Sequence, residues 1–120
     1  MNMGLLMAGL LGATGVAAGA FGAHALDDLV TAERLSVWET AAYYHLIHSV
    51  VVLVLALQQH QALWRWPIMG FVIGVCLFSF SLYLLVLTGI STLAMITPIG
   101  GLLLIISWLG VAFRARRFSS

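Results

Sequence analysis

Long apolar runs separated by short polar stretches divide the chain into four segments. The first run covers about residues 3–25 and contains no Asp, Glu, Lys or Arg, and others cover about residues 37–57, 67–87 and 92–113. An α-helix rises 1.5 Å per residue, so about 20 residues cross a hydrocarbon core roughly 30 Å thick. The pattern therefore predicts an all-α integral membrane protein, with a single transmembrane domain over residues 1–120 folded as a four-helix bundle.

Local signals predict where the second and third helices begin and where the third ends. Ser36 and Glu39 have the Ser-x-x-Glu spacing of a capping box, which predicts the start of the second helix. Trp38 is then expected at the membrane interface, where aromatic side chains gather. Pro67 suits the first turn of the third helix, and Gly89 suits its C-terminal cap.

The start of the fourth helix has two interpretations. Ser91 or Thr92 could cap a helix that runs to Phe113 with a kink at Pro98. Alternatively, Thr97 is the cap and Pro98 is the first helical residue. The second version leaves about 16 residues, which is short for a full crossing. We therefore prefer the kinked helix.

The composition agrees with a membrane protein. Hydrophobic residues make up 62% of the chain and charged residues 8%, compared with about 25% charged residues in soluble domains. The net charge of +1 gives no basis for nucleic-acid binding. Cys76 is the only cysteine, so an intrachain disulfide and a cysteine metal cluster are excluded.

The charged residues are segregated along the chain. All four acidic residues lie between Asp27 and Glu39, together with Arg34. The other arginines are Arg65, in the connection at 58–66, and three near the C-terminus: Arg114, Arg116 and Arg117. Short cytoplasmic loops carry an excess of basic residues. We therefore expect an N-in/C-in orientation, with the inner loop 58–66 in the cytoplasm and the acidic loop 26–36 outside.

Small residues recur at helical spacing and predict close helix packing. Helices in a bilayer associate through close backbone approach and polar contacts, because lipid tails are as apolar as leucine. The stripe on the first helix begins at Ala8, and the predicted packing glycines are Gly12, Gly15, Gly19, Gly22, Gly70 and Gly74. The stripe could form an oligomer interface or pack inside the bundle, and we favour packing inside.

Four polar aromatic residues are expected to gather in the outer leaflet: His24, Tyr44, His45 and His48. Unpaired polar groups are costly in hydrocarbon, so these side chains should face the bundle. In the favoured interpretation they form hydrogen bonds that set the register of the helices. They could instead bind a ligand or titrate near neutral pH. A metal or haem site is the third possibility, with Glu39 or Asp27 completing a zinc site, but we predict no metal and no cofactor.

The chain carries no Ser-His-Asp set, no Gly-rich phosphate loop and no paired carboxylates within the membrane, so an enzyme is not expected. The preferred function is a small structural or accessory membrane protein. The alternative is a small transporter, channel or ligand-binding protein built around the histidines. The expected partners are the lipid bilayer and either another membrane protein or further copies of the chain.

Three groups of residues carry a resemblance to a known family. They are Gly19-Ala-Phe-Gly-Ala-His-Ala-Leu26, Thr40-Ala-Ala-Tyr-Tyr-His45 with Ile47-His-Ser49, and Thr97-Pro-Ile-Gly-Gly101. Over essentially the whole chain the sequence resembles domain of unknown function 423, a family of small bacterial inner-membrane proteins related to eukaryotic transmembrane protein 256. The resemblance implies a multi-pass protein of the cell inner membrane with four helices. It implies no catalytic residues.

Overall fold

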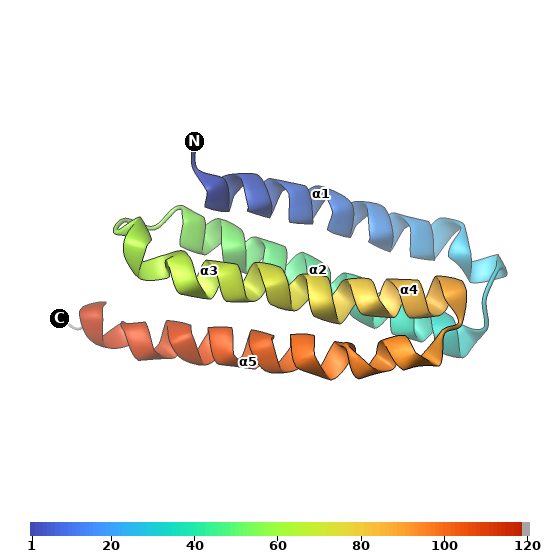
Figure 1. Cartoon of the computed structure of the whole chain (residues 1–120). Helices are drawn as coiled ribbons and strands as arrows, with labels where there is room; N and C mark the ends of the chain where they lie inside the picture. Colours follow the sequence, from blue (N-terminus) through green and yellow to red (C-terminus); the bar gives the residue numbers. More distant parts are fainter. Residues whose placement is uncertain (119–120) are drawn as a thin grey trace.

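Four antiparallel helical rods make up the part of the chain that the computed structural model describes, residues 1–118 (Figure 1). The described elements are all helical. The α-helices are α1 (Met3–His24), α2 (Ala32–Ala56), α3 (Gln61–Val75), α4 (Ser81–Thr88) and α5 (Thr97–Arg114). A π-helical turn, Cys76–Phe80, joins α3 to α4 in one continuous rod. Short 3-10 helices lie at Leu26–Asp28, Ser91–Met95 and Ala115–Phe118.

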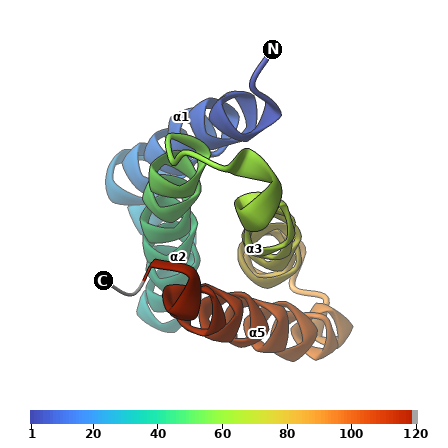
Figure 2. The same ribbon diagram turned by 90° about the vertical axis from the view of Figure 1, so that its left-hand side faces the viewer.

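The four rods are long and apolar enough to cross a membrane. The candidate spans are Met3–His24, Ala32–Ala56, Gln61–Thr88 and Ser91–Arg117. The molecule measures 52 × 26 × 24 Å, with its long dimension along the rods. Seen end-on, α1 and α5 lie on opposite sides, with α2 and α3 between them (Figure 2). The closest pairs are α1 with α2 and α3 with α5, so α2 and α3 join two helical pairs.

The second helix begins earlier than the capping-box prediction. Its N-terminal cap is Thr31, whose hydroxyl accepts a hydrogen bond from the Arg34 N–H at 3.2 Å. Ser36 is inside the helix, where its carbonyl accepts from the Thr40 hydroxyl at 3.1 Å. Thr31 offers an equally good capping oxygen one turn earlier, followed by an acidic residue that suits a helix N-terminus. The predicted outer loop 26–36 is correspondingly shorter.

Trp38 lies inside the bundle and not at an exposed interface. Its side chain is 5% exposed, and its indole N–H donates to the Ala18 carbonyl at 2.8 Å. Gly22 makes room for it, because a Cβ added there would lie 2.6 Å from the Trp38 ring. The ring also packs on Tyr83 of α4 at 4.5 Å between centroids. Trp38 therefore joins α1, α2 and α4 near the end of the bundle where α1 joins α2.

The third helix begins at Gln61, so Pro67 lies inside the helix and not in its first turn. A proline has no N–H for the carbonyl four residues before it, which here is Leu63. The Arg114 guanidinium of α5 donates to that carbonyl instead. A contact from another helix thus satisfies the Leu63 carbonyl, and local sequence signals could not show it. At the other end of the same rod, Gly89 caps α4 at φ 73°, which confirms the prediction for that residue.

The fourth rod begins with the 3-10 helix Ser91–Met95, and α5 follows from Thr97 with Pro98 in its first turn. The structure thus differs from the preferred kinked α-helix. Pro98 has no N–H to donate to the carbonyl four residues before it, so a continuous α-helix from Ser91 would lose a hydrogen bond at this place. Thr97 provides no side-chain cap, since its hydroxyl hydrogen bonds with the Ser81 hydroxyl at 2.6 Å.

Close helix contacts occur at some of the predicted glycines and not at others. A Cβ on Gly15 would lie 2.9 Å from the Leu46 side chain. On α3, a Cβ on Gly70 would overlap the Ser107 side chain of α5, and a Cβ on Gly74 would lie 2.7 Å from the Leu104 side chain. A Cβ on Gly12 would have its nearest neighbour at 3.9 Å, and a Cβ on Gly19 would have none within 4 Å. The packed positions Ala8, Gly15 and Gly22 are seven residues, or about two turns, apart, so they lie in one line along α1, and Gly12 and Gly19 lie to one side of that line.

Candidate functional site

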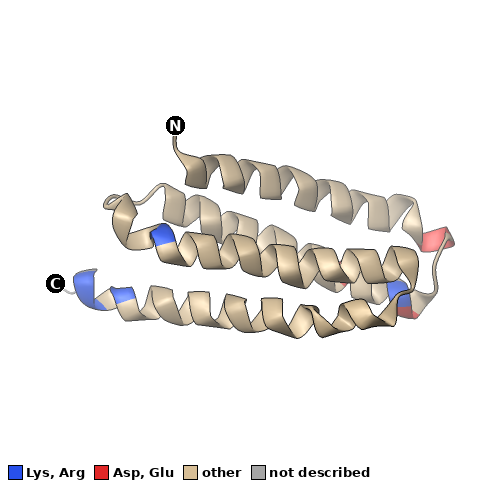
Figure 3. Cartoon of the chain, viewed as in Figure 1, with Lys and Arg blue, Asp and Glu red and all other residues tan. Residues whose placement is uncertain are grey.

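The two ends of the bundle carry different charges. Figure 3 shows acidic residues only at the end where α1 joins α2, which we call the acidic end. Arg34 is there as well, beside Gly89. The opposite end, which we call the arginine end, holds both chain termini, Arg65 and the arginines that follow α5. Between the two ends the polar groups are uncharged hydroxyls and the imidazoles of α2.

His45 is completely buried in the middle of the bundle. Its Nε2 is 3.0 Å from the Thr14 hydroxyl of α1, and its Nδ1 is 2.9 Å from the Tyr83 hydroxyl of α4. The Phe80 ring packs against it at 5.3 Å. A single side chain of α2 thus connects three helices through two hydrogen bonds.

The neighbours of His45 favour one of its two neutral tautomers. The single hydroxyl proton of Thr14 has two carbonyls of its own helix in reach, Leu10 at 2.8 Å and Leu11 at 3.1 Å. With this proton on a carbonyl, the Thr14 oxygen is the acceptor for Nε2–H of His45. A neutral imidazole has one donor and one acceptor, so Nδ1 accepts from the Tyr83 hydroxyl. The hydrogen bonds run in one direction from Tyr83 through His45 and Thr14 to Leu10.

His48 has the opposite tautomer. Its Nδ1 is 2.7 Å from the Tyr44 carbonyl, which can only accept, so Nδ1 carries the proton. Its Nε2 accepts from the Trp108 indole N–H of α5 at 3.1 Å, because an indole nitrogen can only donate. The rings of Tyr44 and Phe71 pack against His48 at 5.8 and 5.6 Å. These contacts join α2 to α5.

The histidines therefore do not form one cluster. His45 reaches α1 and α4, whereas His48 reaches α5, although they are three residues apart on α2. His24 is exposed at the end of α1, ten residues beyond Thr14, or about 15 Å along the helix. Within residues 1–118, no group of three His, Cys, Asp or Glu side chains is placed to hold a metal ion. The structure brings together Tyr44 and His48 but separates them from His24.

Sequence reasoning did not single out the partners of the imidazoles. Thr14, Tyr83 and Trp108 all come from other helices, and no spacing rule connects them to α2. Their only signal was that each is a hydrogen-bonding side chain within an apolar run. Ser79 differs from them, because a helix-interface hydroxyl was expected there: it is buried in the π-helical turn and donates to the Ala41 carbonyl of α2 at 2.8 Å.

Four apolar rods, joined in their interior by neutral hydrogen-bonded side chains, define a multi-pass helical membrane protein. A family model described as "Protein of unknown function (DUF423)" matches residues 18–101. The chain belongs to this family, as the resemblance of its motifs indicated.

Relatives match over nearly their full length. The chain is 36% identical to a UPF0382 membrane protein of Staphylococcus aureus, over 99% of both chains. It is 34% identical to the UPF0382 membrane protein YwdK of Bacillus subtilis, over 98% of this chain and 99% of that one. It is 37% identical to a UPF0382 membrane protein of Haemophilus influenzae, over 93% and 92%. No solved structure matches the chain.

Proposed function

We propose that this protein is a structural or accessory component of the bacterial inner membrane and not an enzyme. The observation that carries the proposal is the use of the imidazoles. All four ring nitrogens of His45 and His48 are engaged by other groups of the bundle. Three of these nitrogens link α2 to another helix and the fourth bonds to the Tyr44 carbonyl of α2 itself, so none can take a substrate, a metal or a transported proton without breaking a hydrogen bond of the bundle.

The hydrogen-bond chain through His45 supports the same conclusion. A proton pathway needs groups that can both accept and release a proton at each step. The chain ends on the backbone carbonyl of Leu10, which can accept a hydrogen bond but has no proton to pass on. The groove of about 710 Å³ at the arginine end is lined by other residues and does not include either buried imidazole. The geometry therefore favours packing over transport.

The proposal includes an N-in/C-in orientation in the inner membrane. Four of the five arginines belong to the arginine end, whereas the acidic end has Arg34 among four carboxylates. Basic residues in short loops favour the cytoplasmic side. The relatives come from bacteria and are named membrane proteins, which supports a location in a bacterial membrane.

Two measurements on the wild-type protein test this function against transport. We expect a membrane-protein partner to co-purify in stoichiometric amount from mild detergent. We also expect proteoliposomes containing the protein alone to hold a pH gradient as well as empty vesicles do. Loss of the gradient that depends on His45, measured with a His45→Gln variant, would contradict the proposal and support a proton pathway.

A further inference from the structure

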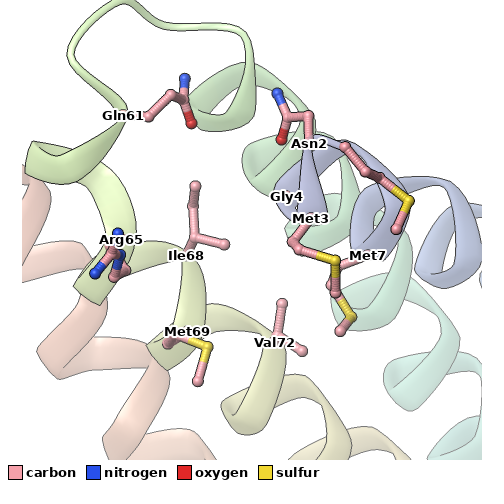
Figure 4. A pocket seen from close by; sticks show the side chains of 10 residues that line it. Asn2, Met3, Gly4, Met7, Gln61, Arg65, Ile68, Met69 and Val72 are labelled. Carbon is pink, nitrogen blue, oxygen red and sulfur yellow. The ribbon is translucent and has the colours of Figure 1, made fainter.

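An open groove lies between α1 and α3 at the arginine end (Figure 4). Its volume is about 710 Å³, within the range of roughly 300–1,000 Å³ typical of small-molecule sites. These two helices make few direct contacts, because each packs mainly on another helix. The groove walls come from Met3, Gly4 and Met7 of α1 and from Ile68, Met69 and Val72 of α3.

The mouth of the groove is polar and basic. Asn2 and Gln61 lie at its rim, and both donate side-chain N–H groups to the Ala56 carbonyl, at 3.1 and 2.9 Å. Arg65 is the only charged side chain that lines the groove. It is exposed and makes no hydrogen bond or ion pair with another residue of the described part of the chain. The amides are thus already bonded, whereas the guanidinium is available.

Among residues 1–118, no acidic side chain lies near Arg65. All four acidic residues lie at the opposite end of a molecule 52 Å long. Its neighbour Trp66 is 76% exposed, and exposed tryptophans mark the level of the lipid headgroups. The planar fork of a guanidinium can donate two hydrogen bonds to the oxygens of one phosphate group.

We propose that the groove between α1 and α3 holds one anionic glycerophospholipid, with its phosphate on Arg65 and an acyl chain between the methionines. Val72 is seven residues beyond Arg65, or about 10 Å deeper along α3. That depth falls within one leaflet, whose hydrocarbon part is about 15 Å thick. Flexible methionine side chains adapt well to the irregular surface of a lipid chain. Basic pockets between transmembrane helices bind acidic headgroups in the same way.

The length of the groove favours a lipid over a second protein chain. A transmembrane partner helix needs about 20 residues of contact length to cross the bilayer. The groove involves α1 only up to Met7 and α3 only up to Val72, so it covers one half of the membrane. Its open side faces the surrounding bilayer, where phospholipid is the abundant occupant.

Native mass spectrometry of the delipidated protein tests the proposal, with phosphatidylglycerol and phosphatidylcholine added in equal amounts to non-ionic detergent. We expect one bound phosphatidylglycerol and preference for it over phosphatidylcholine. Arg65→Gln should weaken phosphatidylglycerol binding about fivefold, which corresponds to about 1 kcal/mol for a basic residue at the membrane surface. Arg65→Lys should keep most of the preference.

Two matched controls separate the groove from the general surface. Arg117→Gln removes the same charge from the same end but lies outside this groove, so it should leave binding unchanged. Met69→Trp should block the acyl chain, whereas Ile105→Trp, at a similarly exposed position on α5, should not. Circular dichroism confirms that each variant is folded.

Four results would overturn the proposal. The first is equal binding of the two lipids to the wild type. The second is an unchanged preference in Arg65→Gln. The third is a dimer that disappears in Met69→Trp, which would make a second copy the occupant. Inorganic phosphate that displaces the lipid at comparable concentration would also contradict it, since a free anion would then suffice.

Discussion

His48 shows how strongly two neighbours can restrict one side chain. A carbonyl on one side can only accept, and an indole on the other can only donate. A doubly protonated ring would place an N–H against the Trp108 N–H. A ring with the proton on Nε2 would leave two donors facing each other and two acceptors facing each other. Only the neutral Nδ1–H form satisfies both contacts.

Substitutions at His48 distinguish a packing role from metal binding. Glutamine can still donate and accept within the bundle, whereas leucine leaves the Trp108 N–H unsatisfied. An unsatisfied buried group costs about 1–3 kcal/mol. We therefore expect thermal unfolding in detergent to show a smaller loss of stability for His48→Gln than for His48→Leu. Equal losses, together with stoichiometric metal in the wild type, would point to a metal ligand instead.

The sequence predicted that His45 and His48 face the bundle but not which residues they meet, and the same prediction for His24 differs from its exposed position. The cost of an unpaired polar group in lipid is a property of the residue itself, so it follows from the sequence. The identity of a partner depends on how the helices cross. Thr14 and Trp108 reach different histidines because α1 and α5 lie on different sides of α2. A shared face on one helix was therefore not sufficient evidence for a cluster.

Among the elements, the rod from α3 to α4 departs most from an ideal helix. Pro67 interrupts its hydrogen bonds near the arginine end, and the π-helical turn Cys76–Phe80 interrupts them in the middle. Both places coincide with close contacts to α5. Arg114 bonds to the Leu63 carbonyl that Pro67 leaves free, and Gly100 lies against the backbone of the π-helical turn. Tertiary contacts thus compensate for each local irregularity.

The contact between Arg114 and Leu63 has a testable dependence on Pro67. Arg114→Met removes the donor and leaves the Leu63 carbonyl unsatisfied, so we expect it to lower the free energy of unfolding by about 1–3 kcal/mol. Pro67→Ala restores an N–H within the helix. In the Pro67→Ala background, the loss caused by Arg114→Met should therefore be smaller. Chemical unfolding of the four proteins in detergent measures this coupling, and strictly additive effects would contradict the account.

Gly100 is the position where a side chain should be least tolerated. A Cβ there would lie 2.4 Å from the Phe78 backbone nitrogen, and backbone cannot move aside as a side chain can. We expect Gly100→Ala to destabilise the protein by at least the roughly 1–3 kcal/mol typical of overpacking. Gly19→Ala is the control, because nothing lies within 4 Å of its Cβ and alanine favours a helix. Similar melting temperatures for both variants would refute this packing.

A helix end could be predicted where its signal belongs to one residue, and not where two residues offer equivalent signals. Gly89 was found correctly because a left-handed cap depends on the glycine itself. The start of α2 was misplaced because Thr31 and Ser36 are both acceptable caps, and the sequence does not rank them. The number of spans followed from apolar length alone, which depends on no partner.

For the whole molecule, the separation of charge predicts how the protein sits in the membrane. Single cysteines introduced into a Cys76→Ala background can be labelled from outside intact cells. We expect an impermeant reagent to label Asp28→Cys at the acidic end and to leave Gln59→Cys unlabelled until the membrane is opened. Both residues are exposed in the structure, so a difference in labelling reports only the side of the bilayer on which each residue lies. The reverse pattern would contradict the N-in/C-in orientation.

The central claim is that the buried imidazoles are neutral links between helices, and their tautomers test it most directly. Nitrogen NMR of protein labelled with ¹⁵N-histidine distinguishes Nδ1–H from Nε2–H in each ring. We expect opposite tautomers, with the proton on Nε2 in His45 and on Nδ1 in His48. Assignment uses His45→Gln and His48→Gln, each of which removes one set of signals. A proton on Nε2 of His48, or a doubly protonated ring, would contradict the hydrogen-bond network on which the proposed function rests.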